Sequence, residues 1–391
     1  MNRKWEYKKI GDICIVERGG SPRPIDQFIT DDEDGINWIK IGDATESMYI
    51  TKTAQKIKPE GMKKSRYVRP GDFLLSNSMS FGRPYILKID GCIHDGWLVL
   101  RDKNNLFDKR FLYYYLSSKT TYQKFKAMAV GGVVNNLNAE MVRKIDVPIP
   151  AKCEQVEISD ALDKLYDVIR MRRQELKELD DLIKSRFVEM FGNPIINSMH
   201  WTEELIGDSC FVTKLAGFEY TQYIHYGNSG DVVMVKAQNV KNGKLNRKDL
   251  SYISNEVSNS LPRSQLAAGD VVMTYVGANI GDVAVIDDEY KYHLAPNVAK
   301  IRPDAEKYNS VYFMYMLMFL NSYIVGNSAD TAKAALGMER IRKLKIFTPP
   351  IDLQEQFATF VKQTDKSKVA VQKALDETQL LFDSLMQKYF G

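Results

Sequence analysis

The feature that most constrains how this chain folds is an internal repeat, in which Gly11 of the first copy corresponds to Gly207 of the second. Each copy opens on a tryptophan followed by Ile-Gly-Asp, at residues 5 and 10–12 and again at residues 201 and 206–208. Each copy ends on Phe-Gly, at residues 191–192 and 390–391. A repeat of this length exceeds the roughly 20–50 residues of a solenoid unit and therefore indicates a duplicated domain. A duplicated domain with diverged loops suggests one task carried out at two places.

Shorter matches mark turns and strands inside each copy. Gly71-Asp72 corresponds to Gly269-Asp270, and an apolar run follows each pair. This pattern predicts a turn that leads into a buried strand. His94 aligns with His293, each beside another apolar run. With the aromatic-rich, helix-like stretches that follow, these elements predict that each copy contains a mixed α/β (α+β) domain of many short elements.

The last part of each copy has a different character. Residues 154–191 and 353–390 contain neither glycine nor proline. Their apolar residues recur at alternating spacings of three and four, which is typical of coiled-coil seams. At 1.5 Å per residue, each helix is about 57 Å long. One small domain cannot cover such a helix, so pairing of the two helices is favoured over packing of each helix on its own domain.

The repeat also predicts a geometry. Two equivalent helices that pair in antiparallel fashion are related by a pseudo-twofold axis, and so are the domains they carry. We therefore expect two globular domains separated by two long antiparallel coiled-coil helices, divided as 1–150, 151–192, 193–350 and 351–391. Dimeric DNA readers bind two half-sites whose spacing follows from the geometry of the protein. If the ligand is DNA, two similar but non-identical domains therefore predict an asymmetric site in two parts.

Composition limits the classes of protein that remain. The apolar fraction of 44% is ordinary for a globular protein, and no apolar run reaches the 18 or so residues of a membrane helix. The N-terminal residues lack the apolar core of a signal peptide. Four scattered cysteines without a Cys-x-x-Cys pair argue against a zinc site and for reduced thiols. We expect a cytoplasmic protein with no bound metal and no membrane association.

The net charge of +4 is unevenly distributed. Residues 1–150 hold 25 Lys and Arg against 18 Asp and Glu, whereas residues 193–350 hold 16 against 16. A basic first copy fits a polyanionic partner such as DNA, although many cytoplasmic proteins carry a similar excess without binding nucleic acid.

The order of these motifs resembles that of the specificity subunits of type I restriction–modification systems, over essentially the whole chain. The shared features are the opening Trp and Gly-Asp, the Gly-Asp turn before a strand, a Pro-rich exit, a Glu-Gln pair, a long helix and a closing Phe-Gly. The Glu-Gln pairs are Glu154-Gln155 and Glu355-Gln356. Residues 214–221, KLAGFEYT, also resemble a known variant of a target-recognition domain. Each motif is weak by itself, but their order, repeated twice, is specific.

The resemblance implies a function. In this family two target-recognition domains each read one half of a split site in double-stranded DNA, and the helices set the spacer between the halves. The helices also dock two methyltransferase (M) subunits, to which restriction/translocase (R) subunits are added. Adenine methylation would then belong to the partners, and S-adenosylmethionine, ATP and Mg would be bound there, with no cofactor on this chain.

Catalysis by the chain itself is disfavoured at the level of motifs. The string nearest to the Asn-Pro-Pro-aromatic turn of an adenine methyltransferase is Asn193-Pro194-Ile195-Ile196, which lacks the second proline and the aromatic residue. No phosphate-binding Gly-x-x-x-x-Gly-Lys-Ser/Thr is present. The acidic run at 31–34 is better explained as a solvated loop than as a nuclease site. His94 and His293 are interpreted as structural or DNA-facing, so we expect no catalytic residue.

Four classes of loop carry candidate side chains for reading bases or contacting phosphates, because base readout needs Arg, Lys, Asn, Gln, Ser or Thr on exposed loops. In the first copy these are Arg18, Ser21 and Arg23; Lys40; Ser76, Asn77, Ser80 and Arg83; and Asn135 and Asn136. In the second copy they are Lys214, Tyr220 and Tyr223; Lys236, Gln238 and Asn239; Tyr275 and Asn279; and Lys333. Any one of them could equally be an ordinary turn residue. As a group they are favoured, because the two copies differ most in these loops.

Two other classes of function stay open at this stage. The chain could be an enzyme that fuses recognition with cleavage or methyl transfer, which methyl transfer by the purified chain alone would establish. It could also be a coiled-coil scaffold that binds only protein, which failure to footprint any DNA with a methyltransferase present would favour. The sequence does not give the bases that are read, because they depend on loop geometry and on DNA shape.

Overall fold

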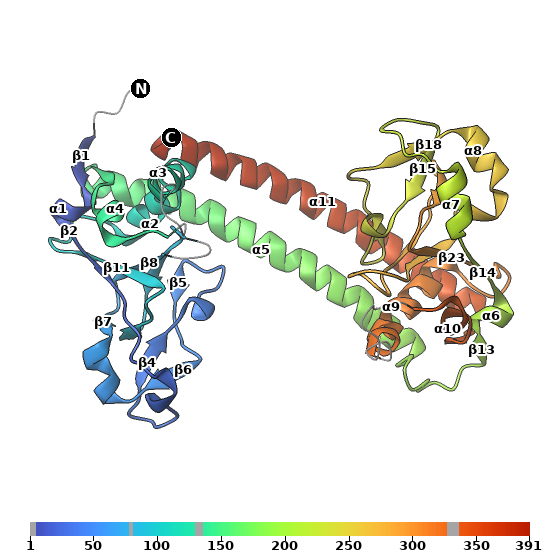
Figure 1. Cartoon of the computed structure of the whole chain (residues 1–391), viewed down its shortest axis with the longest axis horizontal. Helices are drawn as coiled ribbons and strands as arrows, with labels where there is room; N and C mark the ends of the chain where they lie inside the picture. The colour runs from blue at the N-terminus through green and yellow to red at the C-terminus, as the bar shows by residue number, and fades with distance from the viewer. Residues whose placement is uncertain (1–4, 78–80, 130–135, 327–335) are drawn as a thin grey trace. The chain divides into compact units, whose positions relative to one another are not determined.

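The computed structural model describes residues 5–77, 81–129, 136–326 and 336–391 (Figure 1). Contacts divide the chain into two compact units, each of which has its own core. Unit one comprises residues 1–173 and 373–391, and unit two comprises residues 174–372.

Unit one contains two five-stranded sheets. The first has the order β2-β11-β8-β9-β5, from β2 (Cys14–Arg18), β11 (Trp97–Asp102), β8 (Phe73–Ser76), β9 (Pro84–Leu87) and β5 (Tyr49–Ile50). The second has the order β3-β6-β4-β10-β7, from β3 (Ile29–Thr30), β6 (Gln55–Ile57), β4 (Ile36–Ile39), β10 (Gly91–Ile93) and β7 (Arg66–Val68). A ribbon pairs β1 (Glu6–Lys9) with β12 (Asp146–Ile149). The short helices are α1 (Ile10–Ile13), α2 (Lys109–Ser117), α3 (Lys119–Ala129) and α4 (Ala139–Arg143).

Unit two repeats this plan with fewer strands. Its first sheet has the order β14-β23-β20-β21, from β14 (Cys210–Lys214), β23 (Val298–Pro303), β20 (Val271–Thr274) and β21 (Val283–Val285). Its second sheet has the order β18-β15-β22-β19, from β18 (Ser251–Ile253), β15 (Val232–Val235), β22 (Lys291–Leu294) and β19 (Gln265–Leu266). Ribbons pair β13 (Glu203–Leu205) with β24 (Lys345–Phe347) and β16 (Val240–Lys241) with β17 (Lys244–Leu245). The short helices are α6 (Ile206–Ser209), α7 (Gly217–Tyr223), α8 (Asn255–Ser260) and α10 (Met338–Arg342), and α9 (Ser310–Gly326) is longer.

The two units share their topology strand for strand. The order β2-β11-β8-β9 in unit one matches β14-β23-β20-β21 in unit two, with antiparallel pairing throughout. The order β6-β4-β10-β7 matches β18-β15-β22-β19, including one parallel pair in each sheet. The predicted duplication of a mixed α/β domain is therefore confirmed, and unit one carries extra edge strands.

The Gly-Asp pairs do form turns before buried strands. Gly71 and Gly269 have φ values of +93° and +88°, in the left-handed region that glycine adopts without a steric penalty. The strands that follow, β8 and β20, are buried along their whole length in the centre of the sheet. Continuous apolar sequence is what a strand covered on both faces requires.

The aspartate of each pair holds the turn and the sheet together. Its carboxylate accepts the backbone N–H of the residue three positions earlier, at 3.0 Å for Asp72 and 2.8 Å for Asp270. An arginine directly across from the aspartate on the neighbouring strand pairs with it. Arg101 Nε lies 3.0 and 3.1 Å from the Asp72 oxygens, and Arg302 Nε lies 2.6 Å from Asp270 Oδ1. The charges are thus paired inside the sheet, which explains the aspartate at this position in both copies.

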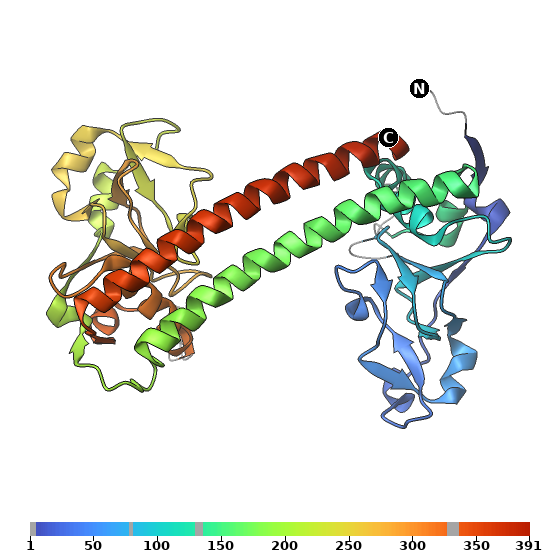
Figure 2. The same cartoon turned by 180° about the vertical axis from the view of Figure 1, so that it is seen from behind.

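The long helices are α5 (Lys152–Phe191) and α11 (Ile351–Phe390), each of 40 residues. The first half of α5 and the last part of α11 belong to unit one, and the remaining halves belong to unit two. The helices therefore run antiparallel within each unit, and the end of α11 lies beside the start of α5 in both views of unit one (Figures 1 and 2). The predicted antiparallel pairing is confirmed.

The apolar stripe of each helix has two tasks rather than one. Ile158 and Leu162 of α5 are buried in the core of unit one, and Ile183 and Phe187 are buried in the core of unit two. Packing on the domains, which the sequence pattern left as the alternative to helix pairing, thus occurs together with it.

The closing phenylalanine of each copy packs in the unit formed by the other copy. Phe390, at the end of the second copy, contacts the rings of Phe111 and Tyr115 in unit one at 5.4 and 5.8 Å. Phe191, at the end of the first copy, contacts Tyr312 in unit two at 4.6 Å. Each domain core is therefore completed by a residue from the other repeat, which explains the phenylalanine near the end of each copy.

The alignment of His94 with His293 is wrong by two residues. In the parallel pair of each second sheet, the carbonyl of Ile39 accepts the N–H of His94 at 3.0 Å, and the carbonyl of Val235 accepts that of Ala295 at 3.2 Å. His94 thus corresponds to Ala295. A shift of two residues preserves the alternation of a strand, so the sequence pattern did not reveal it.

The Glu-Gln alignment is also wrong by two residues. The side-chain oxygen of Gln155 accepts the N–H of Asp108 at 2.7 Å, and its nitrogen donates to the carbonyls of Leu106 and Pro150. Gln354 makes the same three bonds, to the backbone of residues 309, 307 and 349. Gln354 is buried and Gln356 is exposed, so Gln354 is the residue equivalent to Gln155.

Candidate nucleic-acid interface

The four classes of loop border one turn in unit one. Strands β2, β11 and β8 are antiparallel neighbours, so the end of β2, the start of β11 and the end of β8 lie at one edge of the sheet. The loop after β4 reaches this edge because β4 runs parallel to β10, which leads into β11. Asn77 N donates to the carbonyl of Gly96 at 3.0 Å, and Leu137 N donates to the carbonyl of Asn77 at 2.9 Å. All four classes therefore border the turn His94–Gly96.

The carboxylate of Asp95 is the polar centre of this turn. Ser21 Oγ donates to Asp95 Oδ1 at 3.0 Å, and Arg23 Nη2 lies 3.6 Å from Oδ2. His94 Nε2 lies 2.9 Å from Oδ1, while its Nδ1 accepts the N–H of Gly96 at 3.0 Å. Because Nδ1 is an acceptor there, the ring proton is on Nε2, where it is donated to the carboxylate.

The backbone carbonyl of Asp95 holds two further side chains. Arg18 Nε donates to it at 3.1 Å, and Asn77 Nδ2 donates to it at 2.8 Å. Residues from the first and third loop classes therefore meet on one residue. Arg18 and Arg23 are exposed, so the turn presents two guanidinium groups to solvent.

The first loop approaches this turn so closely that only glycine fits. A Cβ on Gly19 would lie 2.2 Å from the carbonyl oxygen of His94. The adjoining backbone is fixed by bonds from Gly19 N to the carbonyl of Trp97 and from Gly20 N to that of Ile93, at 2.9 and 3.1 Å. The pair of glycines at 19–20 thus positions Ser21 and Arg23 over Asp95.

The other predicted residues of the first copy are spread around this centre. Ser76 and Asn77 are buried and shape the loop from within. Arg83 donates to the carbonyl of Thr45 at 3.3 Å, and Lys40 Nζ donates to Gln55 at 2.7 Å, so both cations are turned toward neighbouring loops. Asn136 is exposed beside Leu137.

The equivalent turn of unit two has the same backbone hydrogen bonds but different side chains. Tyr275 N donates to the carbonyl of Asn297 at 2.9 Å, and Leu336 N donates to that of Tyr275 at 2.8 Å, as at the equivalent positions of unit one. Lys214, at the position of Arg18, lies over the ring of Tyr275 at 5.3 Å. Pro296 occupies the position of Asp95. A cation–π contact therefore takes the place of the carboxylate cluster.

The remaining predicted residues of the second copy fall into two groups. Tyr220 and Tyr223 lie on α7, and Tyr223, Gln238 and Asn279 are exposed. Lys236 donates to Asp249 and Ser251, and the amide of buried Asn239 holds the carbonyls of Asn246 and Lys248. Ser80, Asn135 and Lys333 lie outside the described residues. Contact of any of these side chains with DNA stays a prediction.

Sequence reasoning missed Asp95. Asp-Gly between two apolar runs is a turn signal, and it could have marked residues 95–96 as a turn, although β10 and β11 belong to different sheets and form no hairpin. His293, which the comparison of the two copies aligned with His94, is fully buried. Burial lowers its pKa, in keeping with a neutral ring inside the sheet.

The described residues offer little for catalysis. Among them, no group of three or more His, Cys, Asp and Glu side chains is placed to hold a metal ion. Burial raises the pKa of Cys14 and Cys210 to about 12 and that of Cys92 to about 11, so these thiols are protonated at neutral pH. A protonated thiol is a poor nucleophile. Within the same part of the chain, no helix is long and apolar enough to cross a membrane.

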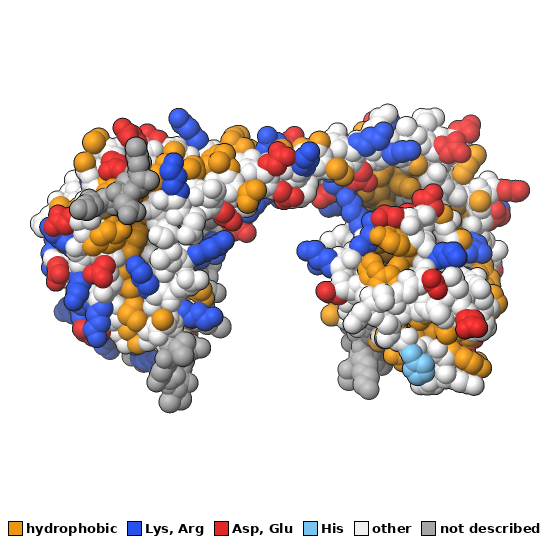
Figure 3. All heavy atoms as spheres, turned by 90° about the horizontal axis from the view of Figure 1, so that it is seen from above, with side chains coloured by type: hydrophobic (Ala, Val, Ile, Leu, Met, Phe, Trp, Pro, Cys, Tyr) orange, Lys and Arg blue, Asp and Glu red, His pale blue; other side chains and the backbone are white. Residues whose placement is uncertain are grey.

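The surface charge is dispersed on one face of the molecule. Figure 3 shows Lys and Arg side chains scattered among acidic and apolar ones over both units. The basic excess of the first copy is therefore not concentrated on this face. The two arginines at Asp95 are a more local source of positive charge.

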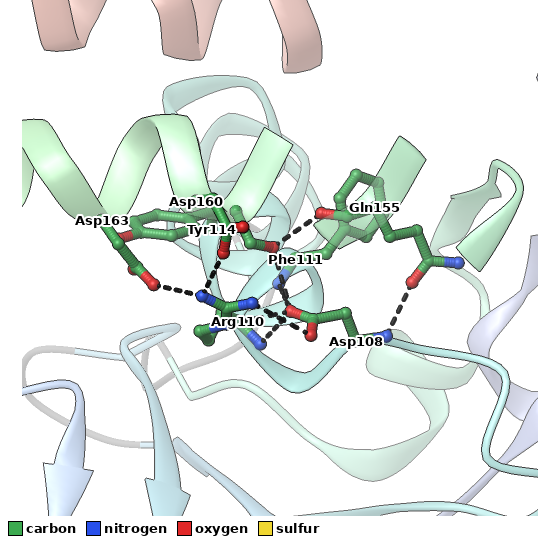
Figure 4. Close-up of polar contacts among 8 residues, drawn as sticks. Asp108, Arg110, Phe111, Tyr114, Gln155, Asp160 and Asp163 are labelled. Atoms are coloured by element: carbon green, nitrogen blue, oxygen red, sulfur yellow. Dashed lines mark hydrogen bonds and ion pairs between the residues drawn. The ribbon is translucent and has the colours of Figure 1, made fainter. Parts of the chain in front are cut away.

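A second polar cluster, at the base of α5, fixes the domain of unit one to that helix (Figure 4). Arg110 Nη1 lies 2.7 Å from both Asp160 Oδ1 and Asp163 Oδ2, and its Nε lies 3.4 Å from Asp108. Tyr114 donates to Asp163 at 2.5 Å. Burial tends to lower the pKa of Arg110, but the bonds to Asp163 and Asp160 outweigh it and raise that pKa.

The equivalent place in unit two is open and largely apolar. Gln155 is equivalent to Gln354, and Asp108 is equivalent to Asn309. Val311 therefore stands at the position of Arg110. Thr359 and Lys362 stand at the positions of Asp160 and Asp163. A pocket of about 920 Å³ is found here. Its lining residues are Asn309, Val311, Glu355, Ala358, Thr359, Val361, Lys362, Asp365, Lys366 and Val369.

Known proteins of one family match this chain over most of its length. The family model for the type I restriction modification DNA specificity domain matches residues 2–181 and again residues 213–378. The EcoBI specificity subunit of Escherichia coli is 20% identical over 390 residues, which cover 92% of this chain and 80% of that protein. The MjaVIII specificity subunit of Methanocaldococcus jannaschii is 21% identical over 397 residues, covering 95% and 90%.

Two solved structures share the fold. The type I restriction–modification S subunit from M. genitalium aligns with a TM-score of 0.58 and 15% identity, over 100% of this chain and 97% of that one. A chain from a study of complex assembly and conformational transition of the type I R-M system aligns with a TM-score of 0.59 and 16% identity, over 100% and 98%. The duplicated domain, the paired helices and the double match lead to one assignment: this chain belongs to the family of type I restriction–modification specificity subunits.

Proposed function

We propose that this chain is the DNA-recognition subunit of a type I restriction–modification system, and that each unit reads one half of an asymmetric, two-part site in double-stranded DNA. The observation that carries the proposal is the loop junction at the β10–β11 turn and its counterpart in unit two. The backbone bonds there are the same in both copies, while Arg18, Asn77 and Asp95 are replaced by Lys214, Tyr275 and Pro296. A shared frame with different side chains is what two readers of different sequences require.

We assign the long helices two tasks within this proposal. Their length would set the number of unspecified base pairs between the half-sites, and their surfaces would dock two methyltransferase subunits, with restriction subunits added to these. The pocket beside α11 supports docking in unit two, because Val311 and Val369 form part of its wall and Val369 is 71% exposed. In unit one the corresponding position holds Arg110, which is paired with Asp160 and Asp163.

Catalysis would belong to the partners. S-adenosylmethionine would be held by the methyltransferase subunits, and ATP and Mg by the partner subunits, in the cytoplasm where the host DNA is found. The protonated thiols of this chain are consistent with a role limited to recognition and assembly.

The proposal is tested by mapping adenine methylation in cells that express this chain with its methyltransferase partner. We expect one two-part motif, in which replacing residues 1–150 with those of a related subunit changes a single half-site. A change in both halves would contradict the two-reader arrangement. Methyl transfer by this chain without a partner would instead establish an enzyme, and a complex that methylates but binds no DNA through this chain would indicate a scaffold.

The spacer role has a separate test. Seven residues inserted after Arg173 and seven after Gln372 would lengthen both helices at the boundary between the units. At 1.5 Å per residue this adds about 10 Å, which corresponds to roughly three base pairs of DNA at 3.4 Å each. We expect a longer spacer with both half-sites unchanged, and altered half-site sequences would contradict the assignment.

A further inference from the structure

We infer that Asp95 is the positioning residue of the reading surface in unit one, and that it directs the guanidinium of Arg23 to a guanine in the half-site that this unit reads. The inference rests on the proposed function and specifies its chemistry. Five side chains from three segments, including the neighbouring His94, converge on this one residue, through its carboxylate or its carbonyl.

The carboxylate is suited to orient a cation rather than to contact DNA directly. It is 30% exposed, and Ser21, Arg23 and His94 occupy its oxygens. An unpaired carboxylate would repel the phosphates, but here two arginines exceed it in charge, so the local balance is positive. Asp95 is thus compatible with a bound polyanion only because its partners surround it.

Arg23 is the partner free to reach a base. Its side chain is 82% exposed, and its Nη2 is 3.6 Å from Asp95, a distance at which the pair guides the guanidinium without enclosing it. An arginine held from one side gives up less rotamer freedom when it binds, which favours binding. The planar fork of a guanidinium matches O6 and N7 of guanine in the major groove, the commonest specific arginine contact with DNA.

Unit two shows that the fold does not require an acidic residue at this position. Pro296 stands there, yet the backbone bonds of the junction are the same. Asp95 therefore contributes to what unit one recognises and not to how the domain folds. This difference makes the inference separable from a purely structural role.

The test uses the complete methyltransferase complex with the variants Asp95→Asn, Arg23→Gln and their combination, and Asp146→Asn on β12 as the control. Asp95→Asn keeps the shape of the side chain and the carbonyl contacts to Arg18 and Asn77. We expect both single variants to lower the preference for one guanine about 10- to 100-fold, as loss of a good arginine–guanine contact does. The combined variant should lose little more, because both residues act through one contact. The other half-site should be unchanged.

Three results would overturn the inference: a unit-one half-site without guanine, an Asp95→Asn complex with unaltered base preference, or additive losses in the combined variant. If Asp95→Asn does not fold, Arg23→Gln and Ser21→Ala serve as the test in its place. Loss of the same guanine preference in these variants supports the inference, and unaltered preference overturns it. If the wild-type complex methylates no two-part site, the proposed function fails instead.

Discussion

Replacing Arg110 with glutamine should destabilise unit one selectively. The guanidinium is 28% exposed and neutralises part of a cluster that contains Asp108, Asp160 and Asp163. Exposed ion pairs contribute about 0.2–1 kcal/mol, whereas removal of one partner from a buried pair costs about 3–5 kcal/mol. Because the four side chains are between 17% and 52% exposed, we expect an intermediate loss of about 2 kcal/mol in the free energy of unfolding, since three carboxylates are left close together.

The effect can be measured on unit one alone. Three of the four tryptophans, at residues 5, 38 and 97, lie in that unit, so a Trp201→Phe background makes tryptophan fluorescence report its unfolding in urea. The matched control is Arg170→Gln, whose single pair with Asp167 is 71% exposed on the arginine side and should change stability by less than about 0.5 kcal/mol.

Two further outcomes follow from the same cluster. In 1 M salt, where the screening length is about 3 Å, the loss caused by Arg110→Gln should shrink. A variant that places the unit-two residues here, with valine at 110, threonine at 160 and lysine at 163, should recover most of it because the like charges are gone. A loss in Arg110→Gln no larger than that in the control would refute the reasoning.

Other predictions address the corrected register and the thiols. Gln354→Leu should cost about 2–4 kcal/mol in unfolding free energy, since it leaves one buried and two half-buried backbone groups without their partner, while Gln356→Leu should be nearly neutral; equal effects would mean that the register is wrong. At pH 8 a thiol reagent should modify native protein at exposed Cys153 first, and rapid modification of Cys14 would contradict its burial. Because the folded-state pKa of Cys14 and Cys210 is raised to about 12, their stabilising contribution is complete below the unfolded value near 9 and is lost as pH rises toward 12, so urea midpoints should fall over that window.

The duplication, the two long helices and the class of fold follow from the amino-acid sequence without any knowledge of tertiary contacts. These properties are local or periodic: a Gly-Asp turn before an apolar run predicts a strand wherever it occurs, and a stripe of period 3.5 predicts a helix that needs a partner. The motif order was enough to indicate the family, because the repeat displayed it twice in one chain.

The register of the two copies and the centre of the reading surface depend on contacts between segments that are distant in the chain. The slips of two residues at His94 and Gln155 were invisible because a strand keeps its inward and outward faces after such a shift, and because two glutamines lie close together near the start of the second helix. Only the hydrogen bonds to Ile39 and Asp108 and their counterparts distinguish the true pairs. Likewise, Ser21, Asn77 and Asp95 are far apart in the chain, and nothing local in the sequence shows that they meet. They do so because antiparallel neighbours bring the end of one strand to the start of the next, which is a property of sheet pairing and not of any single segment.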